Sequence, residues 1–227
     1  MRTIQSFIVL GAAAVVAPRL GAQAPDTARF ESEVRAYEAH DAAAPPAPGA
    51  VLFVGSSSVR LWCTLDRDFA GLRVLNRGFG GSTMGEVLRY APRLVLPYRP
   101  RVVVLYAGDN DLAEGRTPAE VHDAFRRFVA LVHERLPGTR VVYLAVKPSP
   151  ARVQLLGAVR ATNALARADA ERDSLLAYAD VFTPMLRADG RPRPELFGPD
   201  GLHMNSAGYA LWTAVVAPVL GGRAGGR

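Results

Sequence analysis

Cysteine and lysine are almost absent from this chain of 227 residues. Cys63 is the only cysteine. An intramolecular disulfide and a zinc site built on several cysteines are therefore both excluded. The neighbours Trp62 and Leu65 predict a buried helix face, on which the Cys63 thiol packs as a small apolar group and is not a catalytic nucleophile.

Clustered positive charge is also absent. The formal net charge is +6, but it comes almost entirely from arginine, because Lys147 is the only lysine. The arginines are scattered, and no basic run interleaved with aromatic residues occurs, which argues against nucleic-acid binding. Apolar residues make up 49% of the chain, enough for the sizeable core of one domain.

Long hydrophobic runs are missing as well. The stretch from Phe7 to Ala17 has 11 apolar or glycine residues, whereas a membrane-spanning helix needs about 20. Together with Arg2 and the small-x-small sequence Ala22-Gln23-Ala24, it predicts a signal peptide over residues 1–24. We therefore expect export to the periplasm or the extracellular space, without stable membrane insertion. The alternative is an uncleaved N-terminal anchor.

Short apolar runs alternate with helical patterns along the rest of the chain. Strands are expected at 51–54, 72–75, 102–106, 141–146 and 176–181. Helices are expected at 30–40, 117–136, 163–173 and 205–220. Such alternation predicts an α/β fold with a parallel sheet of about five strands and helices on both faces. We expect an N-terminal helix and linker at 25–49, one domain at 50–220 and a disordered tail at 221–227.

Three loops that follow expected strands are small, polar and rich in glycine. They are Gly55–Ser58, Arg77–Ser82 and Gly108–Asp111. Ligands bind at the carboxyl ends of the strands in open parallel sheets. The three loops therefore predict one shared site.

One histidine stands apart from the other three. His40 lies beside the expected linker, and His122 and His133 fall within the helix at 117–136. His203 lies in a loop before the last helix, three residues after Asp200. This spacing suits a histidine base whose tautomer is fixed by a carboxylate. A structural Asp200 and a solvated His203 remain the alternative.

A serine that a histidine base can activate is expected at the first of the three loops. Ser57 follows a strand and starts an expected helix. The α/β-hydrolase elbow is absent, because Val59 replaces its last glycine. An ordinary N-cap serine is the competing interpretation, and Ser56 and Ser58 leave the identity of the attacking serine open.

The other two loops offer hydrogen-bond donors for a negatively charged oxygen. The Asn110 amide and the backbone N–H groups of Gly81 and Ser57 are suitable donors for an oxyanion hole. Alternatively, Gly80-Gly81 forms only a tight turn, and residues 109–111 form a solvated acidic loop or a metal site.

These segments together resemble the four sequence blocks of the SGNH (GDSL-like) hydrolases, in the family's order. The blocks are Val51–Trp62, Asn76–Thr83, Gly108–Asp111 and Asp200–His203. The resemblance spans about residues 50–217. One position departs from the pattern, since Ser56 stands where the family usually has aspartate.

The resemblance implies a flavodoxin-like three-layer fold and a serine esterase that needs no cofactor or metal. It implies Ser57 as nucleophile, His203 as base and Asp200 as the residue that orients the base. It also implies an oxyanion hole made by Ser57, Gly81 and Asn110. The partners expected are small-molecule or carbohydrate esters.

The substrate is less well defined by the sequence. Short loops without an apolar lid favour acetyl to butyryl groups, and Arg60 and Arg77 are either contacts for a polar leaving group or ordinary surface residues. A lysophospholipase or thioesterase, acyl transfer to a sugar, and a non-catalytic carbohydrate-binding domain remain open. A metallophosphoesterase is disfavoured, because Leu112 stands where a ligand aspartate is needed.

Overall fold

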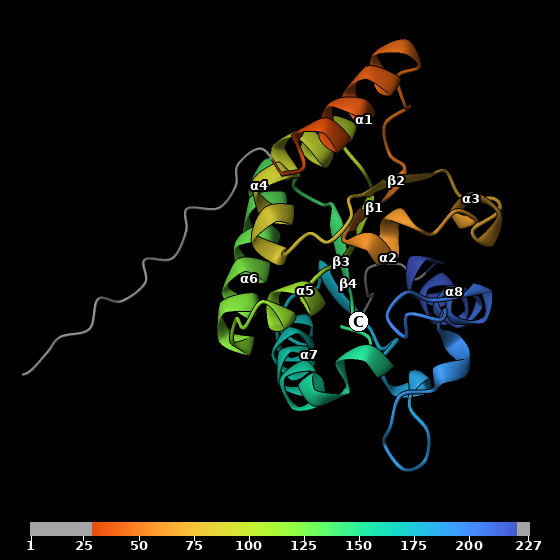
Figure 1. Cartoon of the computed structure of the whole chain (residues 1–227). Coiled ribbons are helices and arrows are strands. Elements are labelled where there is room, and N and C mark those ends of the chain that lie inside the picture. Colours follow the sequence, from red (N-terminus) through yellow and green to blue (C-terminus); the bar gives the residue numbers. More distant parts are fainter. Residues whose placement is uncertain (1–28, 222–227) are drawn as a thin grey trace, which may run out of the picture.

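The computed structural model describes residues 29–221, which form a parallel five-stranded sheet between layers of helices (Figure 1). The strand order is β2-β1-β3-β4-β5, which is the flavodoxin-like order. The predicted three-layer α/β/α fold is confirmed. The strands are β1 (Val51–Gly55), β2 (Val74–Gly78), β3 (Val102–Tyr106), β4 (Arg140–Leu144) and β5 (Leu176–Ala179).

The helices fall into two groups on opposite sides of the sheet (Figure 1). Helices α4, α6 and α7 pack side by side in one layer, and α2, α3 and α8 lie on the other side. Their bounds are α1 (Glu31–Ala43), α2 (Ser57–Arg60), α3 (Leu65–Asp68), α4 (Met84–Leu94), α5 (Asp109–Ala113), α6 (Pro118–Arg135), α7 (Leu156–Ala170) and α8 (Ser206–Gly221). No helix within residues 29–221 is long and apolar enough to cross a membrane.

The register of the central strands places three loops at one edge of the sheet. Gly55, at the end of β1, pairs with Gly78 of β2 and with Tyr106 of β3. The segments that follow these three residues therefore leave the sheet at the same level. This is the physical basis for the shared site predicted from the sequence.

Two predicted elements are shifted. Strand β2 begins at Val74 and includes Arg77 and Gly78, which the sequence placed in a loop. The continuation of β2 is buried at Arg77 and Gly78 but is not apolar, because Arg77 is paired with Asp41, so the sequence shows no apolar run there. Helix α7 begins at Leu156 and ends at Ala170, although the sequence predicted 163–173. The helix predicted at 117–136 is confirmed as α6, and it begins with a capping box in which the side chains of Thr117 and Glu120 bond reciprocally to the backbone.

Aromatic side chains connect the sheet to the layer that contains α8. The Trp62 ring lies 5.7 Å from that of Phe53 in β1 and 5.9 Å from that of Trp212 in α8. Trp62 fills this interior position, and the next residue, Cys63, is exposed. The prediction that Cys63 is buried was wrong, because α2 ends at Arg60 and the chain turns there.

Helix α1 packs beside α4 and against the end of β2 (Figure 1). Arg77 of β2 holds both carboxylate oxygens of Asp41 at 2.8 and 2.7 Å, and its guanidinium lies over the rings of Tyr37 and Tyr98. Arg77 is only 6% exposed. It is therefore neither a surface residue nor a contact for a leaving group, and both sequence interpretations of it were wrong. The expected signal peptide and the tail beyond Gly221 lie outside the described residues.

Candidate active site

Ser57 is the first residue of α2, directly after the turn that ends β1. The turn requires glycine at position 55, where φ is +141° and an added Cβ would lie 1.8 Å from the Tyr106 carbonyl oxygen. The Ser56 N–H then donates to that carbonyl at 3.0 Å, which fixes the start of the loop. Tight pairing of β1 with β3 therefore determines where Ser57 leaves the sheet.

A chain of hydrogen bonds joins Ser57, His203 and Asp200. The Nε2 atom of His203 lies 3.0 Å from the Ser57 Oγ, and its Nδ1 lies 2.6 Å from Asp200 Oδ2. The two ring nitrogens thus contact a hydroxyl on one side and a carboxylate on the other. This arrangement can remove a proton from Ser57 and stabilise the imidazolium that results.

Asp200 is kept ionised by its own loop. Its Oδ1 accepts hydrogen bonds from the backbone N–H groups of Leu202 at 2.9 Å and His203 at 3.0 Å. These donors, together with the His203 side chain, lower the pKa of the Asp200 carboxyl to about 2. One oxygen anchors the loop while the other faces the imidazole, so a single carboxylate sets both the turn and the orientation of the ring.

The two neighbouring serines lie in different environments from Ser57. Ser56 and Ser58 are buried, at 0% and 1% exposure, and neither hydroxyl has a hydrogen-bond partner. Ser57 is partly exposed and contacts His203. Of the three candidate serines, Ser57 is therefore the one whose hydroxyl contacts a histidine.

The second loop contains Gly81 and turns above the end of β2. Gly81 has a φ of +75°, in the left-handed region that glycine adopts without strain. The next residue, Ser82, is buried, and its hydroxyl donates to the Phe79 carbonyl oxygen at 3.1 Å. Thr83 then caps α4 through a second capping box with Glu86. The loop is therefore held at both ends.

The side chain of Asn110 joins this second loop to a loop that the sequence analysis missed. Its Nδ2 donates to the Ser82 carbonyl oxygen at 3.0 Å, and its Oδ1 accepts from Arg152 Nη2 at 3.0 Å. Asn110 is 9% exposed. An asparagine amide carries two N–H donors. One N–H donates to Ser82, and the other has no hydrogen-bond partner within residues 29–221.

A buried ion pair lies beside Asn110. The Lys147 Nζ donates to Asp109 Oδ2 at 2.9 Å and to the Tyr106 hydroxyl at 3.1 Å, and Arg152 Nη1 lies 3.3 Å from the same Asp109 oxygen. Burial alone would raise the pKa of Asp109, but the positive charges of Lys147 and Arg152 outweigh it and lower that pKa. Lys147 is 2% exposed. In the sequence, the sign of this ion pair was the chain's single lysine, which directly follows the apolar run at 141–146.

Asp111 has a structural partner at the start of α4. Its two carboxylate oxygens accept from the Met84 N–H at 3.0 and 2.9 Å. Burial raises the pKa of Asp111 to about 6, and the Met84 hydrogen bond partly opposes this shift. Within residues 29–221 no group of three or more His, Cys, Asp or Glu side chains is arranged to hold a metal ion.

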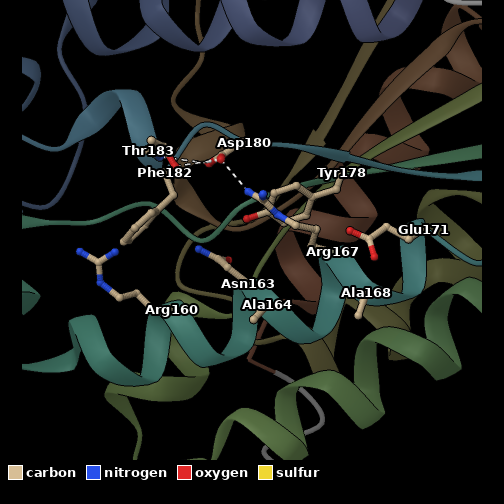
Figure 2. A pocket seen from close by; sticks show the side chains of 10 residues that line it. All are labelled: Arg160, Asn163, Ala164, Arg167, Ala168, Glu171, Tyr178, Asp180, Phe182 and Thr183. Carbon is tan, nitrogen blue, oxygen red and sulfur yellow. Dashed lines mark hydrogen bonds and ion pairs between the residues drawn. The ribbon is translucent and has the colours of Figure 1, made fainter.

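A separate pocket of about 500 Å³ lies between α7 and the segment that follows β5 (Figure 2). Several of the polar side chains that line it contact neighbouring protein groups. Arg167 donates to Asp180 at 2.6 Å, and the Arg160 guanidinium lies over the Phe182 ring (Figure 2). The Asn163 amide is held by the backbone of residue 146. No predicted site residue lines this pocket, and its contacts join α7 to the edge of the sheet.

Comparisons with known proteins identify the family of this chain. The model of the GDSL-like Lipase/Acylhydrolase family matches residues 53–211. Platelet-activating factor acetylhydrolase IB subunit alpha1 of Bos taurus is 31% identical over 169 residues, which cover 70% of this chain and 69% of that protein.

Two solved structures share the fold. One is a protein from Streptococcus pneumonia assigned as a platelet activating factor, with a TM-score of 0.73 and 20% identity over 83% of this chain and 92% of that one. The other is a GDSL-like lipase from Bacteroides thetaiotaomicron, with a TM-score of 0.69 and 23% identity over 83% and 97% of the two chains. This chain therefore belongs to the GDSL-like lipase/acylhydrolase family and is a hydrolase that acts on ester bonds.

Proposed function

We propose that the protein is an exported serine esterase that removes short acyl groups, acetyl to butyryl, from small-molecule or carbohydrate esters. The observation that carries the proposal is the hydrogen-bonded chain from Ser57 Oγ through His203 to Asp200. A nucleophile, a base and an orienting carboxylate in this order are what acyl transfer to serine requires.

The reaction has two halves. Ser57 Oγ attacks the acyl carbon while its proton passes to His203 Nε2, and the imidazolium then protonates the departing alcohol as the ester C–O bond breaks. In the second half, water attacks the acyl-serine and gives its proton to the same nitrogen. His203 then returns this proton to Ser57 Oγ as the Ser57–acyl bond breaks, so the carboxylic acid leaves and both side chains regain their starting states. Asp200 stays ionised throughout and holds the ring.

Negative charge develops on the carbonyl oxygen in both halves. We assign its stabilisation to the N–H groups of Ser57 and Gly81 and to the free N–H of Asn110. Each such donor typically changes the rate by about 10²- to 10³-fold. The support is positional, because the three residues follow β1, β2 and β3, whose ends are in register.

The preference for short acyl groups rests on what surrounds the site. Phe79, Tyr106 and Trp62 are the aromatic residues nearest the motifs, and all three are buried in the core at 0–1% exposure. They therefore offer no open apolar surface to a long chain, for which each buried methylene is worth about 0.8 kcal/mol. The acetylhydrolase relatives also favour a small acyl group. A lysophospholipase or thioesterase is the alternative.

The test combines a covalent probe with a substrate series. A fluorophosphonate should label the wild-type protein and Ser58→Ala but not Ser57→Ala, and hydrolysis of p-nitrophenyl acetate should follow the same pattern. Labelling that persists in Ser57→Ala would contradict the assignment of the nucleophile. An unlabelled wild-type protein without esterase activity would favour the non-catalytic carbohydrate-binding alternative.

Export is a separate part of the proposal and rests on the composition of residues 1–24 alone. Intact-mass analysis of the protein recovered from the periplasm or medium should show a chain that begins near Pro25. A full-length chain in the membrane fraction would instead indicate an uncleaved anchor.

A further inference from the structure

The loop after β4 contributes two cationic side chains to the candidate active site, although none of its residues was assigned a role above. Lys147 lies in this loop, and Arg152 lies within the short 3-10 helix at Pro150–Leu155 that follows it. Both contact Asp109, and Arg152 also contacts Asn110. The segment after β4 therefore contacts Asn110, the residue that is proposed to bind the oxyanion.

The two hydrogen bonds of Asn110 determine where the oxygen and the nitrogen of its side-chain amide lie. Its Oδ1 receives the Arg152 N–H, and its Nδ2 faces the Ser82 carbonyl oxygen. A flipped amide would place two donors together at Arg152 and two acceptors together at Ser82, so both hydrogen bonds would be lost. Arginine has no acceptor, and it therefore enforces one orientation of the amide.

We propose that Arg152 is a positioning residue that keeps the free N–H of Asn110 directed at the oxyanion. This inference rests on the proposed function of Asn110. Asp109 holds Arg152 in place through the 3.3 Å ion pair, and Lys147 in turn fixes Asp109 from the buried side. The Arg152 side chain is 19% exposed, so little water is available to replace its hydrogen bond to the amide.

A planar guanidinium suits this task better than an ammonium group. One nitrogen of Arg152 faces the Asp109 carboxylate and a second donates to the Asn110 carbonyl, and these two nitrogens belong to one rigid fork. Lysine can supply a donor to Asn110 or a charge to Asp109, but it cannot hold the same fixed geometry at both. Arg152→Lys should consequently retain part of the effect that Arg152→Met removes.

The decisive experiment is a double-mutant cycle on steady-state hydrolysis of p-nitrophenyl acetate with Arg152→Met, Asn110→Ala and the double variant. Arg152→Met should reduce kcat by about 10-fold or more and leave KM within about two-fold, because the interaction acts in the transition state. In the Asn110→Ala background the same substitution should change kcat by less than about two-fold. Arg152→Lys should lie between the wild type and Arg152→Met.

Arg160→Met is the matched control, since it removes an arginine that lies over an aromatic ring in the separate pocket, and it should leave kcat unchanged. Thermal unfolding of every variant checks the fold, and Arg152→Lys serves if Arg152→Met does not fold. An equal loss of kcat in both backgrounds, or no loss at all, would overturn the positioning role. If Asn110→Ala itself loses no activity, the proposed oxyanion hole fails instead, so the two failures are distinguishable.

Discussion

His203 Nε2 lies 3.0 Å from the Oγ of Ser57, although 146 residues separate the two in the chain. The sheet makes this contact possible: Ser57 follows the central strand β1, and the loop that carries His203 directly precedes α8. Tyr209 of α8 donates a hydrogen bond from its hydroxyl to the Ser58 carbonyl oxygen at 3.1 Å, which connects that helix to the segment that carries Ser57.

Ser57→Ala and His203→Ala should each reduce ester hydrolysis by several orders of magnitude, and their effects should not add. The two side chains act as one unit, so the second substitution removes little after the first. The measurement is kcat/KM for p-nitrophenyl acetate in both single variants and the double variant. Near-normal turnover of Ser57→Ala, with activity lost in Ser58→Ala, would show that the attacking serine was assigned wrongly.

Asp200→Asn should cost somewhat less, about 10⁴-fold in kcat, because the amide can still contact the imidazole but favours the wrong tautomer and cannot stabilise the charge of the ring. The Asp200 side chain is 51% exposed, so water partly compensates for the lost carboxylate. Since its pKa is about 2, Asp200 stays ionised through the mildly acidic range. A kcat profile measured from pH 4 to 9 should therefore show no change from Asp200 itself. A loss as large as that of His203→Ala would contradict this prediction.

Asp111→Asn should change how stability depends on pH. The folded state raises the pKa of Asp111 to about 6, so it binds this proton more tightly than the unfolded chain does. The free energy of unfolding should therefore fall as pH rises from about 4 to about 6 and then level off. This contribution amounts to about 3 kcal/mol and should be absent from the variant. Urea unfolding of both proteins at pH 4, 5, 6 and 7 measures it, and parallel curves would contradict the prediction.

Arg77→Met should destabilise the fold by about 1–3 kcal/mol, because the partly buried Asp41 carboxylate loses its paired cation and keeps only Tyr98 and His40 as side-chain partners. Adding Asp41→Asn should restore part of the loss, since the unpaired charge is then removed. Urea unfolding of the single and double variants tests the pair. If Arg77→Met has no effect on the midpoint, α1 does not depend on this contact for its position on the domain.

The rate of hydrolysis should fall as the acyl chain lengthens beyond butyrate. The physical reason is that the aromatic side chains near the motifs, Phe79, Tyr106 and Trp62, are buried and offer no apolar surface to a longer chain. A series of p-nitrophenyl esters from acetate to palmitate, compared by kcat/KM, gives the answer. Rates that climb towards palmitate would indicate a lipase or thioesterase.

The sequence by itself determined the fold class and the segments that make the site. Short apolar runs identify buried parallel strands without any tertiary information, and they placed β1 and β3 closely because both lie in the covered centre of the sheet. The start of α6 was equally readable, since the capping box at Thr117 is a local interaction. By contrast, β2 lies at an edge, where half-exposed residues follow no simple pattern.

Only the tertiary structure decided the contacts between segments distant in sequence. The burial of Arg77 depends on Asp41 of α1, and the surroundings of Asn110 depend on Arg152, which follows a different strand. Nothing in the local pattern around Arg77 or Arg152 distinguishes them from the other arginines. The physical reason is that burying a charge costs free energy unless a partner offsets the lost hydration, and the fold alone brings such partners together.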